Sequence, residues 1–81
     1  MNEIIKVGAV FDNTKIQPKW FIWGKQRLDI TKIHYTWNER HGKNTIRHFS
    51  VSDGLNVFEL AYSTEESQWK LLATDTQDRN G

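Results

Sequence analysis

The 81-residue chain contains no cysteine, a single proline and no long run of apolar residues. The lack of cysteine excludes disulfide bonds, thiolate metal sites and thiol catalysis. No segment reaches the ~18 consecutive apolar residues of a membrane-spanning helix, and the amino-terminal segment lacks the charged start and cleavage site of a signal peptide. We therefore expect a cytoplasmic protein with no membrane contact.

Aromatic residues are plentiful, with four Trp, four Phe and two Tyr. A domain of this size buries only about 60% of the surface that its unfolded chain exposes, so its core is thin. Each aromatic ring can bury about 150–250 Å². Aromatic packing should therefore stabilise one β domain at residues 1–73, followed by a disordered polar tail at residues 74–81.

Apolar and polar residues alternate with a period of two along most of the chain, and no amphipathic helix of useful length is evident. This period predicts β-strands separated by turns. The expected fold is all-β, with about six antiparallel strands in meander order, forming a curled sheet or a small SH3-like or half-open barrel. Residues 26–40 are assigned to one long strand, in which a one-residue phase slip indicates a β-bulge or sharp bend.

Hairpin registers predict which residues face a shared core. A two-residue turn at Asp53-Gly54 and a four-residue loop before Gln68 set two of these registers. The expected cross-strand pairs are Phe49 with Phe58, Leu60 with Leu71, Tyr62 with Trp69, Tyr35 with Phe49, and Ile33 with Val51. All of these residues, together with Trp37, then lie on one aromatic face. Arg47 is expected opposite Trp37, with its guanidinium stacked on the indole.

The segment WFIWG at residues 20–24 raises the question of which side chains face that core. Alternation places Phe21 and Trp23 toward the core, with Trp20 on the opposite face. Either the first strand covers Trp20, or Trp20 is half-exposed on a basic surface where a base could stack and cations could bind phosphate. The residues of this candidate surface are Lys19, Trp20, Lys25, Arg27 and Lys32.

Charge is unevenly distributed, although the formal net charge is only +1. Residues 13–48 contain eight Lys or Arg and two acidic residues, whereas residues 49–81 contain two basic and six acidic residues. The basic middle of the chain could contact an anionic partner. Alternatively, basic strands lie beside acidic strands and neutralise them.

A polar cluster is the second candidate site. The predicted registers bring His34, His48 and Glu59 together on the face opposite the aromatic core. Two imidazoles and a carboxylate could bind a metal or perform acid–base chemistry. Because their spacing matches no ligand signature, a solvated strand face is the simpler interpretation. We expect no metal, no cofactor and no enzymatic activity.

The apolar pattern resembles that of a family of small bacterial β-domains of unknown function, with the form F-x-W, V-x-x-V-x-x-x-W, V-[FY]-x-L and W-x-L. The matching residues, spread over residues 19–73, are Phe21, Trp23, Leu28, Ile30, Ile33, Trp37, Phe49, Val51, Phe58, Leu60 and Trp69. Leu28 replaces the usual tyrosine.

Most matched positions are of core type, so the resemblance implies a fold more than a function. Related segments are linked to lesion-bypass DNA polymerases. The leading hypothesis is a non-enzymatic binding module that contacts nucleic acid or a protein that handles it. The alternative is a protein–protein adaptor that uses an exposed strand edge.

Overall fold

The computed structural model describes residues 2–75, and their regular structure is entirely antiparallel β-sheet. The strands are β1 (Glu3–Asp12), β2 (Lys15–Trp23), β3 (Gln26–Asp29), β4 (Lys32–His41), β5 (Asn44–Ser52), β6 (Val57–Ser63) and β7 (Gln68–Asp75). They lie in the order β3-β2-β1-β7-β6-β5-β4. The predicted all-β fold is confirmed.

Two predicted boundaries differ from the structure. The segment at residues 26–40 forms two strands, β3 and β4, instead of one. β7 continues to Asp75, two residues beyond the predicted end of the domain, because Thr74 and Asp75 pair with Phe58 and Val57 of β6. The rest of the predicted tail, residues 76–81, lies outside the described residues. Residues 2–75 contain no helix with the length and apolar character needed to cross a membrane.

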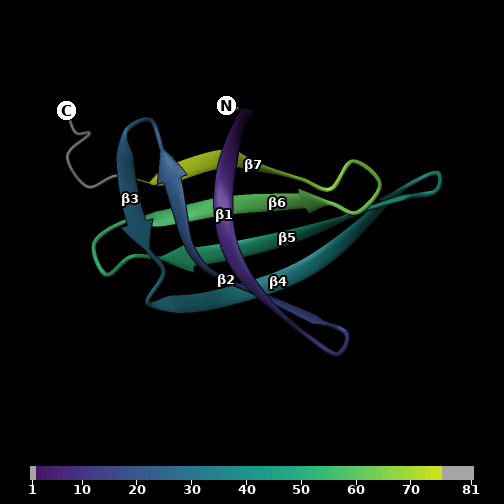
Figure 1. Cartoon of the computed structure of the whole chain (residues 1–81), viewed down its shortest axis with the longest axis horizontal. Coiled ribbons are helices and arrows are strands. Elements are labelled where there is room, and N and C mark those ends of the chain that lie inside the picture. The colour runs from purple at the N-terminus through teal and green to yellow at the C-terminus, as the bar shows by residue number, and fades with distance from the viewer. Residues whose placement is uncertain (1, 76–81) are drawn as a thin grey trace.

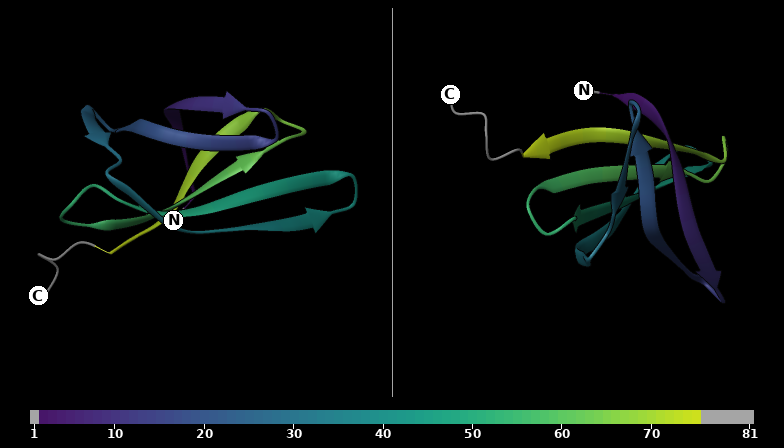
Figure 2. Two further views of the ribbon diagram at one scale, coloured as in Figure 1. Left: turned by 90° about the horizontal axis from the view of Figure 1, so that it is seen from below. Right: turned by 60° about the vertical axis from the view of Figure 1, so that its left-hand side comes forward.

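The strands form two layers that share β1. Figure 1 shows β4 to β7 as one curved layer, with β1, β2 and β3 crossing over one of its faces. Figure 2 shows the same two layers from the side. The start of β1, at Glu3 to Ile5, pairs with β7, whereas Lys6 to Asp12 pair with β2. The sheet therefore curls back over itself through β1 and forms a half-open barrel.

The core lies between these layers and is largely aromatic. Phe21 of β2 is fully buried, and its ring centroid lies 5.1 Å from that of Phe58 on β6 in an edge-to-face arrangement. Trp23 also packs edge-to-face on Phe58, at 6.1 Å. The prediction that Phe21 and Trp23 face the core is confirmed. The buried members of this core are Ile5, Phe21, Phe49, Val51, Phe58, Leu60, Trp69 and Leu71.

The β5–β6 connection corrects one predicted register. Its loop has four residues, since Ser52 pairs directly with Val57. The Asp53 carboxylate stabilises this longer loop by accepting hydrogen bonds from two backbone N–H groups, those of Leu55 at 2.9 Å and Asn56 at 2.8 Å. The predicted pairing of Phe49 with Phe58 is therefore wrong, and Phe49 lies opposite Leu60. In the next hairpin, the predicted pairs Leu60 with Leu71 and Tyr62 with Trp69 are confirmed.

A β-bulge in β4 corrects a second predicted register, that of β4 on β5. Ile33 lies opposite Val51 as predicted, but the register shifts between Ile33 and Tyr35, so that Tyr35 faces Ser50 instead of Phe49. A one-residue insertion moves every later side chain to the other face of the sheet. Tyr35 is consequently 71% exposed and Trp37 43% exposed. The prediction that both belong to the core is wrong.

Candidate functional site

The barrel stays open between β2 and β4. β3 pairs only with Trp20 to Trp23 of β2, so residues 15–18 of β2 have no strand partner on that side among the described residues. β4 pairs only with β5 among residues 2–75. One end of this gap is closed by two backbone hydrogen bonds, from Ile30 N–H to Lys19 O at 2.9 Å and from Thr31 N–H to Ser52 O at 2.8 Å. We call the open gap between residues 15–18 and the free edge of β4 the seam.

Two adjoining cavities lie along the seam. The larger has a volume of about 440 Å³ and lies between the β1–β2 hairpin and strands β4 and β5. The smaller, of about 240 Å³, lies next to the closed end. Gln17 and Ile33 line both cavities, so the two form one groove. Because the two cavities adjoin along the seam, the groove is elongated and can hold an extended ligand.

Among residues 2–75, four cationic side chains line this groove, and no carboxylate does. Lys15 and Arg47 line the larger cavity, and Lys19 and Lys32 line the smaller. We call these four residues the seam cations. None of them forms an ion pair within residues 2–75. The groove is therefore a strip of uncompensated positive charge, which favours an anionic ligand.

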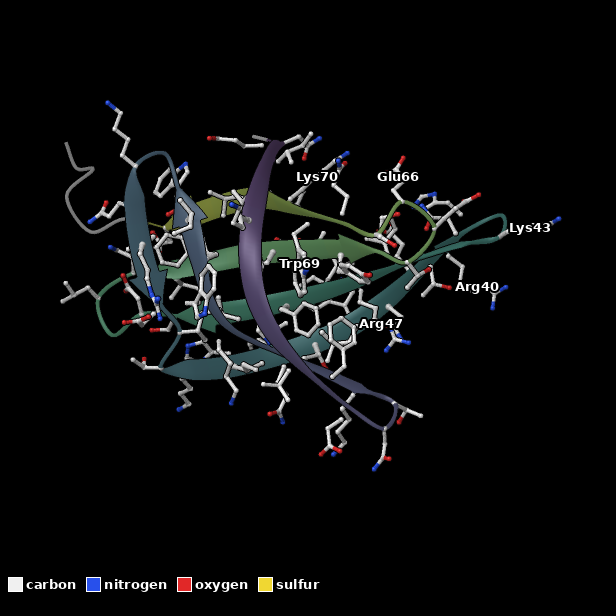
Figure 3. The ribbon with its side chains drawn as sticks, in the orientation of Figure 1. Arg40, Lys43, Arg47, Glu66, Trp69 and Lys70 are labelled. Atoms are coloured by element: carbon white, nitrogen blue, oxygen red, sulfur yellow. The ribbon has the colours of Figure 1, made fainter. Side chains whose placement is uncertain are left out.

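Arg47 is the least solvated of the seam cations. Figure 3 shows it between the protruding β1–β2 and β4–β5 hairpins. Its side chain is half-buried, and its Nε atom is buried without a hydrogen-bond partner in the described chain. Because a buried donor without a partner is costly, an acceptor from a ligand would stabilise it. Arg47 was predicted opposite Trp37, but it pairs with Asn38 instead, so the predicted stacking is wrong.

The residues predicted to form one basic surface around Trp20 lie in different places in the structure. Lys19 and Lys32 line the smaller cavity. Lys25 is exposed in the β2–β3 turn and lines neither cavity. Arg27 forms an ion pair with Asp29 at 3.0 Å and lies over the half-buried Trp20 ring, 4.8 Å from its centroid.

Trp20 also packs closely against β1. A β-carbon at Gly8 would overlap three atoms of the Trp20 indole, so only glycine fits beneath the ring. This contact agrees with the interpretation in which the first strand covers Trp20. The indole thus has neighbours on β1 and β3, and it offers less free ring surface than an open stacking site would need.

The polar cluster forms only in part. His48 is 7% exposed, and its Nδ1 lies 3.4 Å from Glu59 Oε2, as the sequence suggested. His34 makes no such contact and is exposed at the β-bulge. Glu39, which sequence reasoning missed, lies 2.9 Å from His48 Nε2 through Oε1 and 3.3 Å from His41 Nε2 through Oε2. The bulge brings Glu39 to this face, so no unshifted alternation could have found it.

This cluster positions an aromatic ring. The indole of Trp37 stacks on the His48 imidazole with centroids 5.0 Å apart and an interplanar angle of 4°. The hydrogen bond with His48, above all, lowers the pKa of the Glu39 carboxyl, and the nearby His41 adds to the effect. Residues 2–75 contain no group of three or more His, Asp or Glu side chains arranged to hold a metal ion. The cluster thus fixes the orientation of Trp37 on the outer face of β4.

Comparison of the chain with protein-family models, with curated proteins and with solved structures finds no match.

Proposed function

We propose that this domain is a non-catalytic module that binds nucleic acid in the seam. The observation that carries the proposal is the set of four seam cations, which form no ion pair within residues 2–75 and surround a groove to which these residues contribute no carboxylate. Lys and Arg side chains that meet phosphates release condensed counterions, and this release supplies much of the affinity of proteins for nucleic acids. A row of cations along a groove is suited to a chain of phosphates.

The shape of the groove supports the same ligand. Its two cavities adjoin end to end, and cations occur in both. A small anion would occupy one cavity and leave two seam cations unused, whereas a polymer of phosphates would meet all four. The resemblance to domains linked to lesion-bypass DNA polymerases favours nucleic acid within a bacterial cytoplasm.

A second candidate function rests on the free backbone edges. Residues 15–18 of β2 and the whole of β4 lack a strand partner on the seam side within residues 2–75. An extended peptide can add to such an edge through main-chain hydrogen bonds. In this alternative the domain is a protein–protein adaptor, and the seam cations select an acidic peptide.

A charge-matched pair of variants tests the first proposal. A fluorescein-labelled oligothymidylate is titrated at low salt with wild type, with Lys15→Gln/Arg47→Gln, and with the control Lys6→Gln/Lys70→Gln. Each double variant removes the same charge, but the control residues line neither cavity. The seam variant should bind at least about tenfold more weakly, since each charged hydrogen bond contributes about 1.5–3 kcal/mol.

The outcome separates the two functions. Equal losses in both variants would mean that total charge, not the seam, governs binding. The adaptor function replaces the first proposal if wild type does not bind the oligonucleotide but binds an acidic peptide. In that case the amide resonances of β4 should shift when the peptide binds.

A further inference from the structure

The β-bulge at His34 creates a second ligand-facing surface beside the seam. Lys32, Tyr35 and Trp37 of β4 lie opposite Ser52, Ser50 and His48 of β5, respectively. These three β5 residues alternate with the buried Val51 and Phe49, so they share the outer face of the sheet. Lys32, Tyr35 and Trp37 therefore form one outward-facing row, which we call the outer row.

The two aromatic rings of the outer row are accessible. Tyr35 is 71% exposed and Trp37 43% exposed. Exposure of an aromatic ring forfeits a large hydrophobic gain. Among residues 2–75, the other ring exposed to this degree is that of Phe11, at 61%, and it packs edge-to-face on Tyr62. Both lie on β4, whose free edge borders the seam, and Trp37 also contributes to the wall of the larger cavity.

Trp37 is held in place before any ligand arrives. One face of its indole lies parallel to the His48 imidazole, and a hydrogen bond of 2.9 Å between His48 Nε2 and Glu39 Oε1 holds that imidazole in place. The Trp37 side chain nevertheless remains 43% exposed. A ring that is already oriented loses little conformational freedom when a flat ligand stacks on it.

We infer that the outer row is a base-stacking platform, so that the nucleic acid bound in the seam is single-stranded. The inference rests on the proposed function, because the seam would hold the phosphates while Tyr35 and Trp37 stack the bases. Residues two apart on a strand are ~6.6 Å apart, which is about twice the 3.4 Å rise per nucleotide of a stacked duplex strand. Only an unstacked, extended strand can place successive bases on both rings.

The charges around the outer row favour a bound strand whose phosphates lie in the seam and whose bases lie on Tyr35 and Trp37. Lys32 belongs both to the outer row and to the smaller cavity, so positive charge lies on the seam side. Glu39 and Glu59 both approach His48, the residue on which Trp37 stacks. Glu39 of β4 is turned toward β5, away from the free edge, because its Oε1 lies 2.9 Å from His48 Nε2. Glu59 lies on β6, two strands away from that edge. Phosphates are thus attracted to the seam and repelled from the opposite side of the row.

Single-residue variants test the platform separately from the seam. A labelled ~12-nucleotide oligothymidylate and a duplex of equal length are titrated with wild type, Tyr35→Ala, Trp37→Ala, Trp37→Phe and the control Leu55→Ala. Tyr35 and Leu55 are both largely exposed, at 71% and 78%, so neither change should unfold the domain. Losing one stacked base should weaken single-strand binding about 5- to 150-fold and leave duplex binding unchanged.

Each outcome supports or overturns the inference. Support requires weaker single-strand binding by Tyr35→Ala and Trp37→Ala, recovery in Trp37→Phe, and wild-type affinity in Leu55→Ala. If Tyr35→Ala binds like wild type while Lys15→Gln/Arg47→Gln loses affinity, the platform is overturned and the seam function stands. If wild type binds neither the oligonucleotide nor the duplex at low salt, the seam function fails and the platform falls with it.

Discussion

Raising the salt concentration should weaken oligonucleotide binding in proportion to the number of seam cations that meet phosphates. Each phosphate neutralised on a single strand contributes about −0.7 to the slope of log K against log salt concentration. The four seam cations therefore predict a slope of about −2.8. An increase from ~50 to ~200 mM salt should reduce the affinity by about 50-fold.

Removing one seam cation should change this slope by a known amount. Lys15→Gln leaves three seam cations, so the slope should fall to about −2.1 and the loss over the same salt range to about 18-fold. Lys6→Gln removes an equal charge outside both cavities and should keep the wild-type slope. Fluorescence anisotropy titrations at four or more salt concentrations measure all three slopes. A wild-type slope shallower than about −1, or an unchanged slope in Lys15→Gln, would refute the reasoning.

Three further predictions concern stability. Gly8→Ala should reduce the free energy of unfolding by about 1–3 kcal/mol in a urea titration, because its β-carbon would overlap the Trp20 indole. In the Trp20→Ala background the same change should leave the free energy of unfolding unchanged. A reduction in that background would contradict this cause. Phe58→Ala should cost about 3–5 kcal/mol, since the ring is 2% exposed and packs on two other rings, and a cost below about 1 kcal/mol would argue against this core. Because its pKa is lowered in the folded state, Glu39 stabilises the protein fully above its ordinary pKa of 4.5, and this contribution disappears as pH falls through the lowered pKa. The stability difference between wild type and Glu39→Gln should vanish over that acid range, whereas a difference independent of pH would exclude the His48 bond as its source.

The core of the β5–β6–β7 layer was predictable because alternation alone determines it. β6 and β7 pair across a loop whose length the turn residues indicate, so Leu60 faces Leu71 and Tyr62 faces Trp69 as expected. Phe21 and Trp23 were assigned to the core for the same reason. From Leu60 to Ser63, next to the loop, β6 pairs with β7 without an insertion, and the side-chain period of two leaves one register that buries the apolar face.

The errors arise where the chain inserts residues. Tyr35 and Trp37 continue the odd-numbered apolar phase of Ile33, so their pattern imitates a buried strand, yet the extra residue at His34 turns both outward. The Asp53-Gly54 pair is typical of a two-residue turn, but hydrogen bonds to the Asp53 carboxylate stabilise a loop of four. Neither the bulge at His34 nor the longer loop after Ser52 changes the hydrophobic periodicity of the sequence.

The candidate site was partly visible in the sequence. Charge asymmetry identified the middle of the chain as basic, and Lys19 and Lys32 were among the predicted surface residues. Lys15 and Arg47 could not be chosen from the other cations, because their importance depends on where the barrel stays open. That opening results from β1 joining β7, a long-range pairing that local sequence patterns do not encode.

The seam cations also bear on how this domain avoids pairing with copies of itself. Strands with vacant hydrogen-bonding positions recruit one another into intermolecular sheets, and natural proteins place Lys beside such positions to keep neighbours apart by repulsion. Lys15 and Lys32 occupy such places on β2 and β4. Neutralising both should therefore make the isolated domain prone to aggregate, even though neither contributes to its core.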